Sequence, residues 1–298
     1  MNTPAQNDLP TGLVRDMDPD KYHEDPGISA SCLGALAKSG AHYYAHRTEP
    51  REETPAKRYG KMLHTAILEP DQFDKRYCVL PKDAPRKPSS VQIGAKNPSQ
   101  ATLDSIKWWD DWNEANVGMV IVPHEEMEEV KRISGSVLRH PVMRALDGAT
   151  KKVIEGSFFG VDAETGVRIR ARPDILAVID SSLIYLDPKS TEDVRPAAFQ
   201  KSVYNYGYYR QLPFYERAII AAGFRKPDNS MLIAFEKTAP FATRVYELED
   251  DARSAGEYEV NRLLELYAEL EGKYGPPSAD WPGYPTAVER ISLPAWAT

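Results

Sequence analysis

The sequence is poor in cysteine, in long apolar runs and in nucleotide-binding motifs. Two cysteines among 298 residues cannot supply a disulfide scaffold or a four-thiolate zinc or iron–sulfur site. No apolar run approaches the roughly 20 residues of a membrane span, and the N-terminus lacks the apolar core of a signal peptide. No G-x-x-x-x-G-K-[ST] motif is present, so ATP-driven work is not implied. These absences favour a reduced, cytoplasmic protein with no membrane segment.

The overall charge and composition leave the class of partner open. Hydrophobic residues make up 42% of the chain and charged residues 27%, with a net charge of −7, which is ordinary for a globular enzyme. A negative net charge does not by itself suggest a partner that is nucleic acid. It does not exclude nucleic acid either, because acidic metal ligands and a local basic surface can occur in one chain.

The chain is expected to form one main domain. Residues 1–27 are rich in Pro, Asp and Gly and predict an irregular entry segment, while residues 275–298, with several Pro and two Trp, predict an extended tail. Between them, residues 28–274 predict a single α/β domain without internal repeats or a linker.

The densest chemistry lies in one predicted hairpin. An alternating, β-branched stretch runs from Asp174 to Asp187 and is broken once by the turn signal Asp180-Ser181-Ser182. Asp187 and Lys189 share a strand face by the period of two. The hairpin therefore brings two carboxylates and an amine to one end of a sheet, where Mg²⁺ or Mn²⁺ is the expected counter-ion.

Further candidate residues lie on either side of this hairpin. Gly60 and His64 are one turn apart on a predicted helix over 55–69, and Gln211 and Tyr215 are one turn apart on a later helical stretch. A lone histidine on a helix favours a structural role when taken by itself.

A basic loop over 81–102 carries candidate phosphate contacts at Lys82, Arg86 and Lys87, with a solvated loop as the alternative. The helix that follows contains Trp108, Trp109 and Trp112, which we expect mainly in the core, with base stacking as the alternative.

In this order the residues resemble the PD-(D/E)xK nuclease superfamily, specifically its RecB-like branch. The matching elements are G-x-x-x-H at Gly60–His64, the Asp of Arg172-Pro173-Asp174, D-x-K at Asp187–Lys189 and Q-x-x-x-Y at Gln211–Tyr215. The N-terminal half is more similar still to the nuclease domain of the RecE exonucleases (exonuclease VIII), over about residues 20–220. The alternative is a coincidental ion-pair network on an α/β protein.

The resemblance implies a restriction-endonuclease-like fold, with a central mixed β-sheet flanked by helices. It also implies a Mg²⁺- or Mn²⁺-dependent exodeoxyribonuclease that hydrolyses linear double-stranded DNA 5′→3′ and leaves 3′ overhangs. The expected setting is phage-type DNA recombination, with a homo-oligomeric ring (a tetramer) and a RecT-like single-strand annealing protein as partner.

The metal ligands expected from these elements are Asp174, Asp187 and His64, with Glu155 as a further candidate. Such an ion would polarise both the attacking water and the scissile phosphate. Lys189 would orient or deprotonate that water, or neutralise a phosphate oxygen.

The remaining expected roles concern the DNA backbone. By resemblance, Gln211 and Tyr215 lie beside the metal cluster and position the backbone. Arg170 and Arg172 are candidate phosphate clamps, the alternative being salt bridges on an exposed strand face.

Pro188 departs from the family pattern, in which an apolar residue with a backbone N–H is usual inside D-x-K. Proline in a central strand removes a donor and favours an edge or a bulge, which would displace Lys189. One alternative function is therefore a catalytically silent DNA-binding protein in which Pro188 has disabled the site. Two others stay open independently of Pro188: a structure-specific endonuclease or nickase on the same fold, and a metal enzyme that does not act on nucleic acid.

Overall fold

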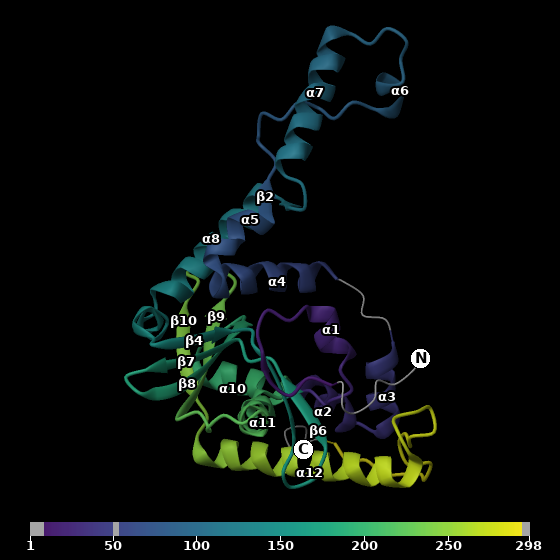
Figure 1. Ribbon diagram of the computed structural model, residues 1–298, viewed down its shortest axis with the longest axis vertical. Helices are drawn as coiled ribbons and strands as arrows, with labels where there is room; N and C mark the ends of the chain where they lie inside the picture. The colour runs from purple at the N-terminus through teal and green to yellow at the C-terminus, as the bar shows by residue number, and fades with distance from the viewer. Residues whose placement is uncertain (1–8, 50–53, 294–298) are drawn as a thin grey trace.

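The computed structural model describes residues 9–49 and 54–293, built around a five-stranded mixed sheet (Figure 1). Its strands, in the order β10-β9-β8-β7-β4, are β4 (Lys151–Ile154), β7 (Ile175–Ile179), β8 (Ser182–Thr191), β9 (Asn229–Glu236) and β10 (Thr243–Glu247). Strands β8 and β9 run parallel, and the other neighbours run antiparallel. The expected α/β class, a central mixed sheet flanked by helices, is confirmed.

Helices cover both faces of this sheet, because successive strand residues alternate between them. The helices are α4 (Pro55–Leu68) and α8 (His124–Arg139) on one face, and α10 (Pro196–Asn205) and α11 (Tyr208–Ala221) on the other. On β7, Ile175 and Ala177 pack into the core beneath α4 and α8, whereas Leu176 packs toward α10 and α11. The short helix α9 (Pro141–Arg144) and the 3₁₀ helix η2 (Ala145–Gly148) link α8 to β4.

A smaller sheet stands beside the main one and contradicts the expectation of an irregular entry segment. Its strands, in the order β1-β5-β6, are β1 (Gly12–Val14), β5 (Ser157–Val161) and β6 (Arg168–Ala171). Strand β1 is followed by helix α1 (Pro19–Glu24), which Asp18 caps by accepting from two backbone N–H groups. The three-residue strand is too short for a periodic signal, and it forms because β5 provides its hydrogen-bond partners.

A second core surrounds β6. It contains α2 (Ala30–Leu36), α3 (Gly40–Thr48) and the long helix α12 (Asp250–Tyr274). In the tail, Trp281 is buried and its ring stacks on Tyr43 at 5.4 Å between centroids. No helix within the described ranges combines the length and the apolar character needed to cross a membrane.

An arm projects from the domain between α4 and α8 (Figure 1). It contains α5 (Pro70–Arg76), β2 (Tyr77–Val79), α6 (Ser90–Ile93), α7 (Gln100–Ala115) and β3 (Val120–Val122). The tryptophans of α7 are half-exposed and pack on one another, Trp108 against Trp109 at 5.1 Å. The expectation that they belong to the core is wrong, because the arm has no second layer to bury them.

Candidate active site

Glu155 and Asp174 lie at the two points where the chain passes between the two sheets. Glu155 follows β4 with a positive φ of 47°, and its N–H donates to the carbonyl oxygen of Asp174 over 3.0 Å. Gly156 makes this passage possible, since a Cβ there would lie 2.4 Å from Cγ1 of Val153. The divergence of the sheets thus places two carboxylates side by side.

The hairpin predicted around Asp187 is confirmed. Strands β7 and β8 pair antiparallel from Ile175↔Leu186 to Ile179↔Ser182, and the turn residues Asp180 and Ser181 have positive φ. Nζ of Lys189 lies 2.8 Å from Oδ1 of Asp187, whose side chain is 1% exposed.

Tyr185 completes this strand face and was missed by the sequence analysis. Its buried hydroxyl donates to Oδ2 of Asp187 over 3.1 Å. Its position two residues before Asp187 is the signal that would have found it, because alternate residues share a face.

Pro188 causes no bulge. The pairing of β8 with β9 runs unbroken through Pro188↔Ile233 to Thr191↔Glu236. On its other side, β8 pairs with β7 only as far as Leu186, which lies opposite Ile175, the first residue of β7. From Asp187 onward, no described strand pairs with this side of β8. Because proline is tolerated where no strand needs its N–H, the expected displacement of Lys189 does not occur.

His64 reaches the cluster from α4, where the residues next to it, Leu63 and Thr65, are buried. Nε2 of His64 lies 3.0 Å from Oδ1 of Asp174, and Nδ1 lies 3.5 Å from Oε1 of Glu155. Both ring nitrogens therefore face carboxylates.

The close packing of these charges shifts their pKa values. Burial disfavours the imidazolium of His64, but Asp174 and Glu155 outweigh it and raise the pKa of His64 to about 9. Burial, together with the neighbouring Asp174 carboxylate, raises the pKa of Asp187 to about 7 despite Lys189. The pKa of Asp174 is lowered: burial opposes this, but His64 and Lys189 stabilise its charged form.

A cavity of about 710 Å³ opens onto this cluster. His64, Glu155 and Asp174 line it together with Gln211 and Tyr215 of α11.

Asp187 and Lys189 are not among the residues that line this cavity. They lie beside Asp174, which does line the cavity. Ile175 pairs with Leu186, so Asp174 and Asp187 are neighbours at the end of the hairpin, and the Asp174 carboxylate raises the pKa of Asp187. The structure thus brings together all seven residues expected to form the metal and catalytic cluster: His64, Glu155, Asp174, Asp187, Lys189, Gln211 and Tyr215.

The cavity wall is basic. Arg172 lines it while donating to Ser157 Oγ and to the Met17 carbonyl, both over 3.0 Å. Arg210 also lines it, and its guanidinium is held by Glu259 at 2.6 Å.

Lys61 and Arg76 are the other basic residues of the wall, and neither they nor Arg210 were expected from the sequence. The sequence contains a clue to two of these residues, because each lies close to an expected site residue: Lys61 is three residues before His64, and Arg210 directly precedes Gln211.

Arg170 cannot contact DNA, and its expected role as a phosphate clamp is wrong. The side chain is fully buried, donates to the carbonyl oxygen of Gly27 over 2.8 Å and lies 4.5 Å from the ring centre of Tyr22. The segment around α1 covers this strand face, which the sequence analysis took to be exposed.

The other basic residues expected to contact DNA lie on the arm, away from the cavity (Figure 1). Lys82, Arg86 and Lys87 are exposed there. The ammonium of Lys87 lies 5.4 Å from the ring centre of Trp109.

The cluster fits a divalent cation by its chemistry. Oδ1 of Asp187 is buried without a hydrogen bond, and its near partner is the ammonium of Lys189 at 2.8 Å. Two adjacent carboxylates and an imidazole are ligands suited to Mg²⁺ or Mn²⁺. Within the described ranges, no three such side chains form a preformed metal-binding group, since His64 and Asp174 are paired with each other.

Comparisons with solved structures give distant likenesses. A candidate exonuclease from Eubacterium rectale is 13% identical, with a TM-score of 0.48 over 85% of this chain and 87% of that one. The protein SSO0001 is 13% identical (TM-score 0.26, 48% and 69% covered), and VC1899 from Vibrio cholerae is 12% identical (TM-score 0.21, 85% and 59% covered). No curated protein sequence matches significantly.

The family assignment rests on a family model rather than on these structures. The model described as a PDDEXK-like domain of unknown function (DUF3799) matches residues 29–279. This span covers most of the chain and contains every member of the cluster around Asp174. The chain therefore belongs to this family of PDDEXK-like domains, within the PD-(D/E)xK nuclease superfamily.

Proposed function

We propose that this protein is a divalent-metal-dependent exodeoxyribonuclease that degrades linear double-stranded DNA. The observation that carries the proposal is the meeting of His64, Asp174, Asp187 and Lys189 beside one basic cavity. Phosphodiester hydrolysis needs an activated water and stabilisation of negative charge on the phosphate, and this cluster is suited to both. We assign the catalytic unit to residues 28–274.

Each residue of the cluster has a distinct proposed task. His64, Glu155, Asp174 and Asp187 would hold a Mg²⁺ or Mn²⁺ ion, which when bound polarises the attacking water and the scissile phosphate. Burial opposes the charge on Lys189, but Asp187 and Asp174 outweigh it and raise the pKa of Lys189. A protonated Lys189 suits the role of a charged donor to a phosphate oxygen.

The wall of the cavity would bind the DNA backbone. Arg172 and Arg210 present guanidinium groups there, and guanidinium binds phosphate oxygens in a bidentate manner. Gln211 and Tyr215 line the same cavity as these arginines and the carboxylates, and we assign them the orienting of the strand.

The finer features of the proposal are supported by the resemblance to RecE-type enzymes over about residues 20–220. They are 5′→3′ polarity, a 3′ single-stranded overhang and a cytoplasmic, phage-type recombination setting. The proposed assembly is a homo-oligomeric ring that works with a RecT-like annealing protein.

Digestion of end-labelled linear duplex beside a covalently closed circle, with Mg²⁺, Mn²⁺ or a chelator, tests the proposal. We expect mononucleotides from the linear substrate, an intact circle and no product in chelator. Cutting of the circle would identify an endonuclease or nickase. Binding of linear DNA without any metal-dependent product would identify a silent DNA-binding protein.

A further inference from the structure

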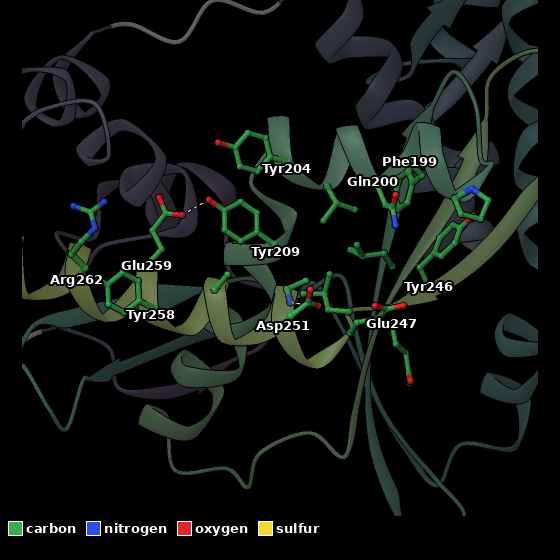
Figure 2. A pocket seen from close by; sticks show the side chains of 17 residues that line it. Phe199, Gln200, Tyr204, Tyr209, Tyr246, Glu247, Asp251, Tyr258, Glu259 and Arg262 are labelled. Atoms are coloured by element: carbon green, nitrogen blue, oxygen red, sulfur yellow. Dashed lines mark hydrogen bonds between the residues drawn. The ribbon is translucent and has the colours of Figure 1, made fainter. Parts of the chain in front are cut away.

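An apolar groove lies between α10, β10 and the first half of α12, separate from the basic cavity (Figure 2). Its volume is about 720 Å³. Phe199, Tyr246 and Leu248 line it, and Tyr204 and Tyr258 are 73% and 70% exposed beside it. An aromatic surface of this kind is typical of a protein-docking site.

The groove is also acidic. Glu247, Glu249 and Asp251 line it and are exposed. Arg262 lies beside Glu259, at the end away from Glu247 (Figure 2). Glu259 is already occupied, since it accepts from Tyr209 and is paired with Arg210. The open carboxylates would repel phosphates and favour a partner that combines apolar anchors with Lys or Arg.

The arm of this chain carries apolar side chains that nothing covers. Within residues 80–119, all of them described, no residue is buried. On α6, Val91 and Ile93 are 81% and 55% exposed. A helical arm without a core of its own gains stability when its apolar side chains are buried against another surface.

The same segment of the arm is basic. Residues 82–96 contain Lys82, Arg86, Lys87 and Lys96 against a single acidic residue, Asp83. All four basic side chains are exposed. The segment therefore has the two properties that the groove requires, positive charge and uncovered apolar side chains.

The arm does not reach the groove of its own chain. The arm forms one end of the molecule along its longest axis, whereas α10 and α12 lie toward the other end (Figure 1). A contact between the two surfaces must join different copies. Because the surfaces differ, the contact is head-to-tail, and each copy offers one arm and one groove.

We propose that residues 82–96 of one copy dock in the groove of a second copy. Val91 and Ile93 enter among the aromatic side chains, and the basic residues of the segment face Glu247, Glu249 and Asp251. The proposal concerns assembly and does not depend on the nuclease activity.

Light scattering on the full-length protein, with two single substitutions, tests the contact. Ala255→Arg places a long cation in the groove at an exposed position of α12, and Val91→Asp places a charge on α6. Matched controls are Ser254→Arg, exposed next to the groove, and Val117→Asp, 80% exposed elsewhere on the arm. We expect the wild type and both controls to assemble, and both test variants to remain monomers.

Mixing the two test variants gives the sharper result. The Ala255→Arg copy retains its arm and the Val91→Asp copy retains its groove, so the mixture should form a dimer of twice the monomer mass and nothing larger. A mixture that stays monomeric, or a wild type that is monomeric at all concentrations, would overturn the proposal. Loss of DNA binding by Val91→Asp without a change in mass would also overturn it, assigning the arm to DNA instead.

Discussion

Nε2 of His64 lies 3.0 Å from Oδ1 of Asp174. This contact links helix α4 to the segment where the chain crosses from β6 to β7, between the two sheets. The other ring nitrogen faces Glu155 at 3.5 Å. A histidine between two carboxylates favours its protonated form, and the pKa of His64 is accordingly raised from 6.5 to about 9. In the proposed metal-bound state, the ion would replace this proton on His64.

Metal binding should therefore depend on pH. A metal ion must displace the proton of His64, so the apparent affinity for Mn²⁺ should rise about tenfold per pH unit between pH 7.5, where Asp187 has already lost its own proton, and pH 9. The stability of the metal-free protein should change in the opposite direction. The protonated His64 contributes its full stabilisation below pH 6.5, and this contribution is lost as the pH rises to about 9. The increase in Tm on adding Mn²⁺ should grow across this range.

The matched variant is His64→Asn, which keeps a polar side chain but cannot hold the proton. Its metal-induced change in Tm should be smaller and nearly flat above pH 7.5, where Asp187, with a raised pKa of about 7, has also lost its proton. A wild-type response that is equally flat would show that His64 is not a ligand.

Replacement of Lys189 by Met should abolish most of the activity while preserving metal binding. Met keeps the length of the side chain and removes its charge, so the rate should fall by about 100-fold to 1000-fold, the usual effect of losing one donor to a charged transition state. Single-turnover digestion measures the rate. An unchanged Mn²⁺-induced shift in Tm would show that the ligands are intact, and a rate within twofold of wild type would exclude the assigned role.

Pro188→Val restores the apolar residue that is usual between the Asp and the Lys. Because β8 keeps its register with β9 through Pro188, the rate should stay within about threefold of wild type. Loss of the constrained ring should lower the free energy of unfolding by about 0.4–1 kcal/mol. A large gain in rate on this substitution would indicate instead that the proline impairs the natural site.

Arg210→Ala should weaken DNA binding without affecting the metal ligands. Arg210 lines the basic cavity and is held there by Glu259. Loss of one phosphate contact should reduce the slope of log affinity against log salt by about one. The control is Arg225→Ala, since Arg225 pairs with Asp228 and with Ser181 at the far end of the β7–β8 hairpin. Equal slopes for both variants would place the DNA elsewhere.

The local parts of the site were predictable from the sequence, because alternation and helical spacing are local properties. The sequence placed Asp187 and Lys189 on one strand face, and the structure has them 2.8 Å apart. Helical spacing likewise put Gln211 and Tyr215 on one face of α11, and both line the cavity.

Long-range coverage was not predictable. The sequence of β6 could not reveal that the entry segment folds over Arg170 and buries it, on a strand face that we expected to be exposed. The Trp-rich sequence of α7 resembles that of a core helix, and only the tertiary structure shows that no second layer buries its tryptophans. The effect of Pro188 also depends on long-range structure. A proline fits at this position of β8 because the pairing with the neighbouring strand β7 stops at Leu186.

Asp187→Asn tests the assignment of the cluster most directly. The amide keeps the volume of this buried side chain and removes a ligand charge beside Asp174, so the fold should persist. Metal-dependent release of nucleotides from linear duplex should fall by about 1000-fold, equivalent to about 4 kcal/mol of lost transition-state stabilisation. Asp147→Asn, at an exposed position of η2, is the control and should retain the wild-type rate. Wild-type digestion by Asp187→Asn, with Mg²⁺ present and the fold intact, would contradict the assignment of this cluster as the catalytic site.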